Sequence, residues 1–269
     1  MSLPRLIATD LDGTFLSPDS TISATNLAAI ERAQDAGIPV MFATGRPPTW
    51  LHVIDDVTLA DSRVVAANGA VLIDVATRTV LEDHPIRPAV AAEVADELRA
   101  AIDGVAFAAQ YSESFGHEDG FMTEIPPQMR GDIHVGELPD LLHVDRVIKL
   151  LVRHTRMGAV ELAERANAVI GQRLTVTFSM SKDYGLLELS APGITKAHML
   201  SQLAASLGID AADVAAFGDM PNDYAMLEWA GRPHVMGDAH PLLSQLDATR
   251  IGTNAEDAVG RTILSWFGD

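Results

Sequence analysis

The sequence predicts an α/β protein with a doubly wound, mostly parallel sheet and an inserted α+β domain. Continuous apolar runs at Leu6–Thr9, Ile38–Ala43 and Val214–Phe217 are typical of parallel strands that are buried on both faces. Stretches of helical periodicity lie between such runs, which indicates strand-helix units. The length of 269 residues favours two domains, at roughly 150 residues for each.

The region before residue 84 is expected to supply strands of the main sheet and a small ribbon. Ser23 precedes a helical pattern, and Gly37 follows it as a stop signal. Arg63–Ala67 is predicted to form a third parallel strand. Asn68-Gly69 then separates two apolar runs, which predicts a hairpin, and Thr79–Leu81 completes the ribbon.

The pattern changes at Pro85 and Pro88, which marks a domain boundary. The elements expected after it are a helix from Val90, extended segments at Val105–Tyr111 and Arg146–Val152, a helix at Met157–Ile170, and paired strands at Leu174–Met180 and Gly185–Leu189. Ser112–Leu142 is rich in Gly, Pro and acidic residues and predicts functional loops. We expect a core domain of residues 1–83 and 188–269 and an inserted domain of residues 84–187.

The last part of the chain returns to the pattern of the main sheet. A helix is expected to open around Lys196 and to stop at Gly208. Short strands centred on Val235 and Ile251 and an amphipathic helix over Asp257–Phe267 complete the core.

Composition limits the classes of function. The chain contains no cysteine, so disulfides, thiolate metal sites and a cysteine nucleophile are excluded. The formal net charge of −18 opposes attraction to nucleic acid and anionic lipid, whereas small anions can still bind at local positive groups. No apolar run reaches the roughly 18 residues of a membrane span, and a secretory signal pattern is absent at the start. We therefore expect a cytoplasmic protein without nucleic-acid or membrane partners.

Two carboxylates end the first apolar run and suggest a metal site. Asp10 and Asp12 repel each other, so a fold that keeps both near one strand end needs a cation or a shared proton. Mg²⁺ prefers oxygen ligands and is the natural candidate. Gly13 permits a tight turn, and the Thr14 hydroxyl can hold a nearby carboxylate. Asp-Gly also occurs in ordinary turns, so this stretch by itself leaves a purely structural role open.

The second strand ends in Thr44-Gly45-Arg46-Pro47, in which the proline suits a helix start. Thr44 and the backbone N–H groups around Gly45 can donate hydrogen bonds to an anion at the sheet edge, although a capping turn explains them equally well. Asn68 can line the same site, but its place in the hairpin favours a turn role.

Further polar residues lie at later strand and helix ends. Lys196 in a first helical turn opposes the helix dipole unless an anion binds there, and the alternative is a solvated surface lysine. Asp219 ends another strand, while Asn222 and Asp223 beside it also suit a helix cap and a first turn. Together these groups provide carboxylates for a metal and donors for an anion at one sheet edge, a combination that matches phosphoryl transfer assisted by Mg²⁺.

The four segments Asp10–Thr14, Thr44–Arg46, Lys196 and Gly218–Asp223 resemble the ordered motifs of the haloacid dehalogenase superfamily. The insertion between the second and third motifs, together with Asn68-Gly69, is similar to the Cof-type phosphatase branch, whose large α/β cap covers the site. The resemblance extends over essentially the whole chain. It implies a Rossmann-like core, an inserted cap and a phosphatase that depends on Mg²⁺.

The resemblance implies catalytic and metal-binding roles for three aspartates. Asp10 attacks phosphorus to form an aspartyl phosphate, and Asp12 protonates the leaving oxygen and later activates water. Mg²⁺ is held by the Asp10 carboxylate, the backbone carbonyl of Asp12 and Asp219. This division leaves the Asp12 side chain available for proton transfer.

The resemblance also implies which residues surround these aspartates. Phosphate is bound by Thr44, Gly45, Lys196 and Asn222, which offset its charge. Supporting positions are Thr14, Arg46, Asn68 and Asp223. Asp223 is expected to support the metal shell or Lys196, whereas Arg46 contacts substrate or has a surface or interdomain role.

The expected substrate is a small phosphorylated metabolite, bound by a monomer or a small homo-oligomer. Few aromatic residues are present to form a nucleobase platform, so sugar phosphates fit better. Cap residues that can project toward the cleft are Phe107, Tyr111, His117, Met180 and Tyr184. Burial in the cap core is the better expectation for most of them.

Two other functions use related chemistry. A phosphomutase returns the phosphoryl group to its substrate instead of to water. A phosphoacceptor signalling domain also uses an aspartate at a strand end, although the inserted domain argues against it.

Overall fold

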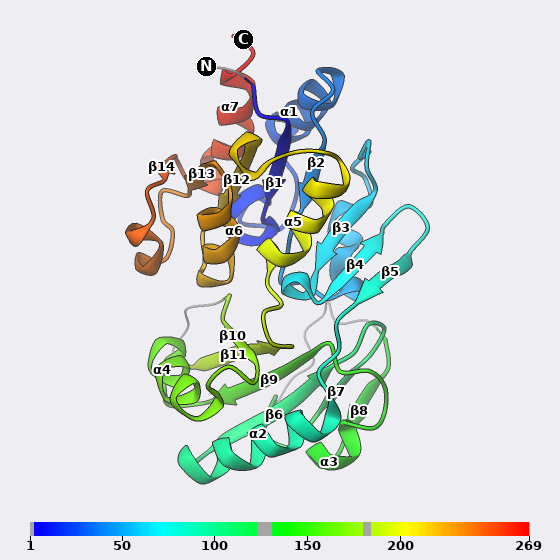
Figure 1. The fold of residues 1–269 in the computed structure, drawn as a ribbon, viewed down its shortest axis with the longest axis vertical. Helices are drawn as coiled ribbons and strands as arrows, with labels where there is room; N and C mark the ends of the chain where they lie inside the picture. Colours follow the sequence, from blue (N-terminus) through cyan, green and yellow to red (C-terminus); the bar gives the residue numbers. More distant parts are fainter. Residues whose placement is uncertain (1–2, 123–130, 180–183, 269) are drawn as a thin grey trace.

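Two α/β units lie one above the other, and both chain termini are at the far end of the upper unit (Figure 1). This computed structural model describes residues 3–122, 131–179 and 184–268. The upper unit is the core, and the lower unit is a cap formed by the middle of the chain. The predicted α/β class with an inserted α+β cap is confirmed.

The core sheet is parallel throughout. Its strands are β1 (Leu6–Thr9), β2 (Val40–Phe42), β12 (Val214–Gly218), β13 (Arg232–Val235) and β14 (Thr249–Arg250). They pair in the order β14-β13-β12-β1-β2, which places β1 between β2 and β12. Ile251, predicted as the centre of a strand, follows the end of the short strand β14.

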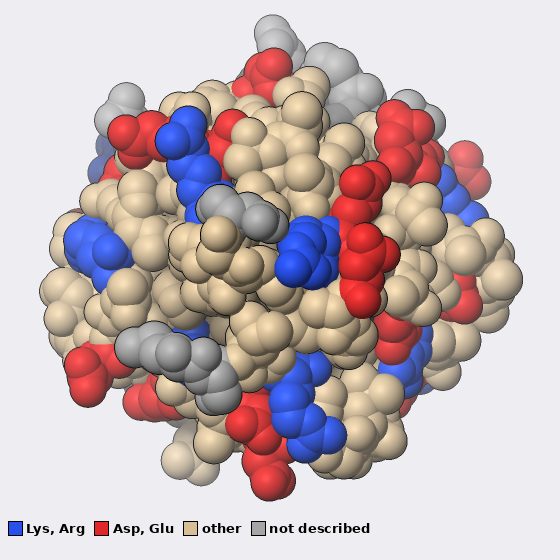
Figure 2. All heavy atoms as spheres, turned by 90° about the horizontal axis from the view of Figure 1, so that it is seen from above, with Lys and Arg blue, Asp and Glu red and all other residues tan. Residues whose placement is uncertain are grey.

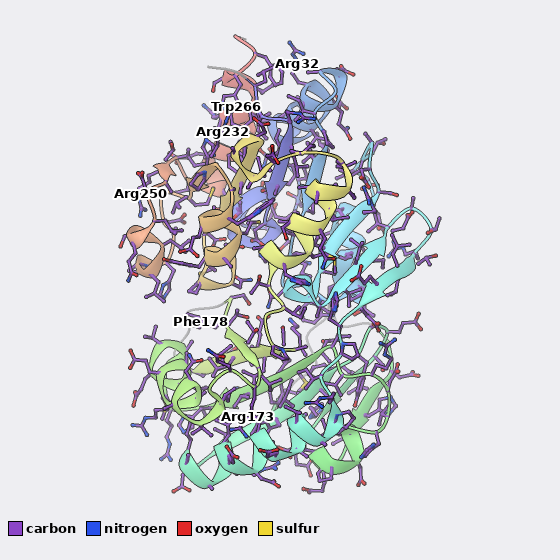
Figure 3. The ribbon with its side chains drawn as sticks, viewed as in Figure 1. Arg32, Arg173, Phe178, Arg232, Arg250 and Trp266 are labelled. Carbon is purple, nitrogen blue, oxygen red and sulfur yellow. The ribbon has the colours of Figure 1, made fainter. Side chains whose placement is uncertain are left out.

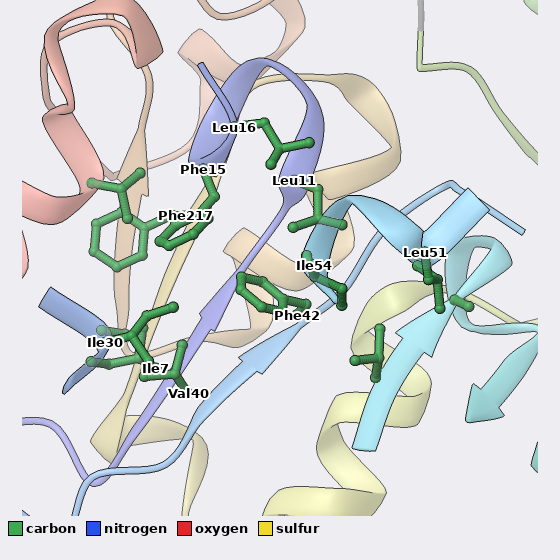
Figure 4. Packing of buried hydrophobic residues seen from close by; sticks show 14 of the residues in the cluster. Ile7, Leu11, Phe15, Leu16, Ile30, Val40, Phe42, Leu51, Ile54 and Phe217 are labelled. Atoms are coloured by element: carbon green, nitrogen blue, oxygen red, sulfur yellow. The ribbon is translucent and has the colours of Figure 1, made fainter. Parts of the chain in front are cut away.

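Helices cover both faces of the core sheet, as a doubly wound fold requires. The helices are α1 (Ala24–Asp35), α5 (Lys196–Ser206), α6 (Tyr224–Trp229) and α7 (Ala258–Ser265). Ile7 and Phe42 pack in one apolar cluster with Ile30 of α1 (Figure 4). Leu6 and Ala8 pack in another cluster with residues of α5 and α6. Side chains alternate between the two faces of a strand, so an all-apolar strand supplies both clusters.

A three-stranded ribbon lies beside the core sheet. It consists of β3 (Arg63–Ala66), β4 (Val71–Asp74) and β5 (Thr79–Asp83), and its strands are antiparallel. A single parallel bridge from Ala43 to Val65 links β3 to the chain just after β2. The predicted third parallel strand is therefore an antiparallel ribbon strand with one parallel contact to the core. The predicted hairpin is present, and Asn68 (φ 59°) and Gly69 (φ 96°) form its turn.

The cap contains a mixed sheet with helices on one face. Its strands are β6 (Val105–Gln110), β7 (Phe115–His117), β8 (Ile133–Val135), β9 (Lys149–His154), β10 (Thr175–Thr177) and β11 (Gly185–Ser190). They pair in the order β10-β11-β9-β6-β7-β8. Its helices are α2 (Pro88–Ala101), α3 (Leu138–Leu141) and α4 (Ala159–Ile170). The helices α2 and α4 lie on the side of the sheet away from the core (Figure 1).

Two sequence predictions for the cap need correction. Ser112–Leu142, expected to form loops, contains β7, β8 and α3; these elements are three or four residues long and give little periodic signal. The expected border between residues 187 and 188 falls inside β11, which pairs with β9 and β10. Met180, predicted to end a strand and considered above as a cap residue near the cleft, lies outside the described residues.

Charged side chains are dispersed over the surface in the view of Figure 2. On that end of the core, Lys and Arg stand in separate groups among acidic and other residues (Figure 2). Within the described ranges, the helices lack the length and apolar character that are needed to cross a membrane.

The turn at Gly69 sets how closely the ribbon approaches α5. A Cβ atom at Gly69 would lie 2.1 Å from the carbonyl oxygen of Thr195, the residue that caps α5. We expect Gly69→Ala to lower the free energy of unfolding through two separate costs. An alanine in the left-handed backbone conformation costs about 1–2 kcal/mol. The clash of its Cβ with Thr195 adds about 1–3 kcal/mol. Gly37→Ala is the control, because Gly37 also has positive φ but its Cβ would meet nothing within 4 Å. Urea unfolding of both variants measures the difference, and equal losses would contradict the proposed contact.

Candidate active site

The carboxyl ends of three neighbouring strands and the start of one helix form the site. Asp10 follows β1, Thr44 follows β2 and Asp219 follows β12. The Asp10 backbone N–H donates to Phe217 of β12, which continues the ladder to the sheet edge. Lys196 is the first residue of α5. Parallel strands end at one edge, so segments far apart in the sequence meet there.

Lys196 joins two of the carboxylates inside the protein. Its ammonium group donates to Asp10 Oδ1 at 2.5 Å and to Asp223 Oδ1 at 2.6 Å. The side chain is 0% exposed, which excludes the surface lysine considered above. Burial acts to lower the pKa of Lys196, but the charges of Asp10 and Asp223 outweigh it and raise the pKa above its usual value. Lys196 therefore remains a cation at the helix start.

Three carboxylates converge around this lysine. Asp10, Asp219 and Asp223 each place an oxygen within 4.8 Å of the others. Burial raises the pKa of Asp10 well above its usual value, and the neighbouring carboxylates add to that effect against the opposing charge of Lys196. Burial and the charge of Asp223 raise the pKa of Asp219 to about 7. One lysine does not balance three ionised carboxylates, so the site either keeps a proton on a carboxylate or carries a surplus of negative charge.

The surplus charge and the oxygen atoms fit a divalent cation such as Mg²⁺. Asp223 already accepts from Lys196 and, through Oδ2, from the backbone N–H groups of Asp219 and Met220. It therefore holds the loop and the lysine in place. Thr14 donates to Asp219 Oδ1 at 2.8 Å. A Cβ at Gly13 would lie 2.3 Å from Asp219 Oδ2, so only glycine allows this carboxylate to approach the turn.

Asp12 lies in a different environment from Asp10. Both carboxylate oxygens of Asp12 bind the Arg46 guanidinium group, at 2.7 Å from Nε and 2.6 Å from Nη2. The Asp12 side chain is 54% exposed, and it is not a member of the buried carboxylate cluster. Arg46, whose role the sequence left open, therefore holds the position of Asp12.

Neutral groups surround the end of β2. The Thr44 hydroxyl oxygen accepts from the Arg46 backbone N–H, as in a capping turn, and its hydrogen can still be donated to an anion. Asn222 Nδ2 donates to Asn68 Oδ1 at 3.0 Å. Asn222 is buried, and its Oδ1 has no hydrogen-bond partner among the described residues. The structure thus brings Asn68, expected mainly as a turn residue, into contact with a predicted phosphate ligand.

Two charged cap residues at the site were missed by the sequence analysis. Lys149 of β9 donates to the Gly45 carbonyl oxygen and to Glu188 Oε2, both at 2.8 Å. Glu188 of β11 also accepts from Asn68. Each residue is a buried charge between two apolar neighbours in the sequence, and that signal could have identified them.

The cap residues considered from the sequence are mostly structural. Phe107 and Tyr111 are buried in the apolar core between the cap sheet and its helices, as expected. His117 is also buried, and its Nδ1 contacts the carbonyl oxygen of Glu118. The Arg153 guanidinium lies over the ring of Tyr184. Phe178 lies where the cap meets the core, with its ring 5.5 Å from that of His240 (Figure 3).

A family model of haloacid dehalogenase-like hydrolases matches residues 7–263, a range that includes all of these site residues. The chain belongs to this family. The pyridoxal phosphate phosphatase YbhA of Escherichia coli (strain K12) is 27% identical over 97% of this chain and 98% of its own. The HMP-PP phosphatase of Enterobacter sp. (strain 638) is 30% identical over 98% of this chain and 96% of its own. With the family match, these relatives identify a haloacid dehalogenase phosphatase, a phosphoric monoester hydrolase.

Solved structures show the same fold over the full chain. SMU.1108c from Streptococcus mutans UA159 has a TM-score of 0.84 at 22% identity and covers 100% of both chains. The subclass IIB sugar phosphatase BT4131 has a TM-score of 0.78 at 18% identity. The match covers 98% of the present chain and 99% of the BT4131 chain. The haloacid dehalogenase membership and the inserted cap that the motifs suggested are confirmed.

The raised pKa of Asp219 predicts how pH changes stabilisation by Mg²⁺. The folded protein keeps a proton on Asp219 up to about pH 7, whereas the ordinary pKa is 3.8. Between these values the folded state binds more protons than the unfolded state, so the metal-free protein loses stability as pH rises. A bound cation replaces the proton. We expect Mg²⁺ to raise the melting temperature more at pH 8 than at pH 5.5.

Calorimetry with Mg²⁺ or with EDTA at the two pH values measures this difference. Asp219→Asn should abolish most of the Mg²⁺-dependent shift. An equal shift at both pH values would contradict a site at which protons and metal compete.

Proposed function

We propose that this enzyme hydrolyses small phosphomonoesters through an aspartyl phosphate on Asp10, with Mg²⁺ as cofactor. The observation that carries the proposal is the convergence of Asp10, Lys196 and Asp219 at one sheet edge. Lys196 holds one oxygen of Asp10 and provides positive charge where an anionic phosphate must approach a carboxylate. Without such charge, attack of one anion on another is strongly opposed.

The proposed reaction has two displacements at phosphorus. A carboxylate oxygen of Asp10 forms a bond to phosphorus while the bond to the ester oxygen breaks, and Asp12 gives its proton to that oxygen. Asp12 then accepts a proton from water as the water oxygen attacks the aspartyl phosphate. Inorganic phosphate leaves, and the Asp10 carboxylate is regenerated. The contrast between buried Asp10 and half-exposed Asp12 supports these different roles.

The metal and phosphate ligands are proposed on the same geometry. The Asp10 and Asp219 carboxylates and the backbone carbonyl of Asp12 would hold Mg²⁺, with Asp223 and Thr14 as supports. When bound, Mg²⁺ neutralises charge on the phosphoryl oxygens. The phosphate ligands would be Thr44, Gly45, Lys196 and Asn222.

The proposed substrate is a small phosphorylated metabolite, with sugar phosphates as the leading class. The relatives act on pyridoxal phosphate and on HMP-PP, and BT4131 is a sugar phosphatase. The cap presents Lys149 and Glu188 to the site, and such polar groups suit a small polar substrate better than an extended apolar one. A monomer or small homo-oligomer remains the expected assembly.

Replacement of the nucleophile tests the proposed mechanism directly. Asp10→Asn should reduce release of inorganic phosphate from sugar phosphates and pyridoxal phosphate by roughly 10³-fold or more, because the amide is a poor nucleophile. Asp35→Asn, an exposed position at the end of α1, is the matched control and should retain activity. Retained turnover in Asp10→Asn would refute the nucleophile. An isomeric product without phosphate release would indicate a phosphomutase.

The contact between Arg46 and Asp12 predicts a second effect. Arg46→Met should lower kcat by about 10-fold or more with a smaller change in KM, because Asp12 loses its position for proton transfer. Asp12→Asn should then cost much less in the Arg46→Met background than in the parent enzyme. A rise in KM with unchanged kcat would instead show that Arg46 contacts the substrate.

A further inference from the structure

A chain of buried hydrogen bonds runs from the cap into the proposed phosphate site. Lys149 donates to Glu188 Oε2, and Asn68 Nδ2 donates to the same carboxylate. Asn68 Oδ1 in turn accepts from Asn222 Nδ2. Lys149 also donates to the carbonyl oxygen of Gly45. Two cap residues are therefore connected with three residues that belong to different motifs of the core.

The cap charges face the core because of strand alternation. Leu187 and Leu189 of β11 pack with the cap helices, so Glu188 between them points to the opposite face of the sheet. The same alternation places Lys149 opposite to Leu150. The face of the cap sheet that lacks the helices α2 and α4 is the one that meets the core (Figure 1).

Glu188 already accepts hydrogen bonds from three protein side chains. One oxygen accepts from Lys149 and Asn68, and the other accepts from the Ser179 hydroxyl. Burial acts to raise the pKa of Glu188, but the charge of Lys149 and these hydrogen bonds outweigh it and lower the pKa. Glu188 thus stays ionised, and its partners are protein groups. This arrangement favours positioning over direct capture of a substrate.

An ionised carboxylate determines which way the two amides point. It can only accept hydrogen bonds, so Asn68 must turn its NH₂ group toward Glu188. The Oδ1 atom of Asn68 then faces Asn222, which must turn its own NH₂ group toward Asn68. Oε2 of Glu188 accepts from both Lys149 and Asn68, so an oxygen is needed there even without the charge. Removing that acceptor oxygen would allow both amides to reverse.

We propose that Glu188 is a positioning residue for the phosphatase reaction: held by Lys149, it fixes the amide orientation of Asn68 and, through Asn68, that of Asn222. The docked cap thereby completes the phosphate-binding edge of the core. This inference rests on the function proposed above, in which Asn222 binds phosphate.

Glu188→Leu tests the inference, because leucine removes both acceptor oxygens at similar side-chain size. We expect kcat/KM for a sugar phosphate or an aryl phosphate to fall by about 10- to 100-fold, with partial recovery in Glu188→Asp. Glu118→Leu is the control. Glu118 is another buried cap carboxylate, paired with Arg99 and bound to the backbone N–H of Phe107. This control variant should have a lower melting temperature than the parent enzyme, but its kcat/KM should stay within about two-fold of the parent value.

A double-variant cycle identifies the residue that Glu188 acts on. Asn222→Ala should reduce kcat/KM much less in the Glu188→Leu background than in the parent enzyme, because both changes remove the same oriented amide. If the two changes instead reduced kcat/KM independently, so that their fold-losses multiplied, the proposal would be overturned. Activity of Glu188→Leu equal to that of Glu118→Leu would also overturn it.

The side-chain amide signals of Asn68 and Asn222 give a readout that does not need turnover. In ¹H–¹⁵N spectra, assigned with the Asn68→Ala and Asn222→Ala variants, Glu188→Leu should shift both pairs of signals and accelerate their hydrogen exchange. Glu118→Leu should leave them in place. If the parent enzyme hydrolysed no phosphate ester, the proposed function would fail, but unchanged amide signals in Glu188→Leu would separately overturn the positioning role.

Discussion

The buried pairing of Lys196 with Asp10 and Asp223 is the interaction on which the site depends. An ammonium group without access to water is tolerated only where carboxylates surround it, so the lysine fixes the distance between β1, α5 and the loop after β12. Gly69 allows the ribbon to approach the capping residue of α5 and thereby holds the start of that helix. The lysine leaves part of the negative charge unbalanced, and that remainder is what makes the edge suitable for a metal.

One short stretch places two aspartates in unlike surroundings. Asp10 is buried beside Lys196, whereas Asp12 is half exposed and bound by Arg46. A fold that separates neighbouring carboxylates in this way can assign nucleophilic attack to one and proton transfer to the other. The tight turn at Gly13, which also admits Asp219 at close range, makes that separation possible within three residues.

The cap and the core meet at the site through polar groups. Strand alternation in the cap directs apolar side chains toward its own helices and directs Lys149 and Glu188 toward the core. The buried pair and its amide partners have little freedom, because each donor already faces an acceptor. The same residues that join the two units therefore also define the polar surroundings of the proposed phosphate site.

The sequence alone determined the fold class and the location of the site. Apolar runs with helical stretches between them specify a parallel sheet, and Asp10, Lys196 and Asp219 lie at the ends of such elements, where topology brings them together. Only the tertiary structure decided the pairing of Arg46 with Asp12 and the chain from Glu188 through Asn68 to Asn222. Those contacts join segments that are 34 to 154 residues apart, and local periodicity carries no information about which distant side chains will face each other.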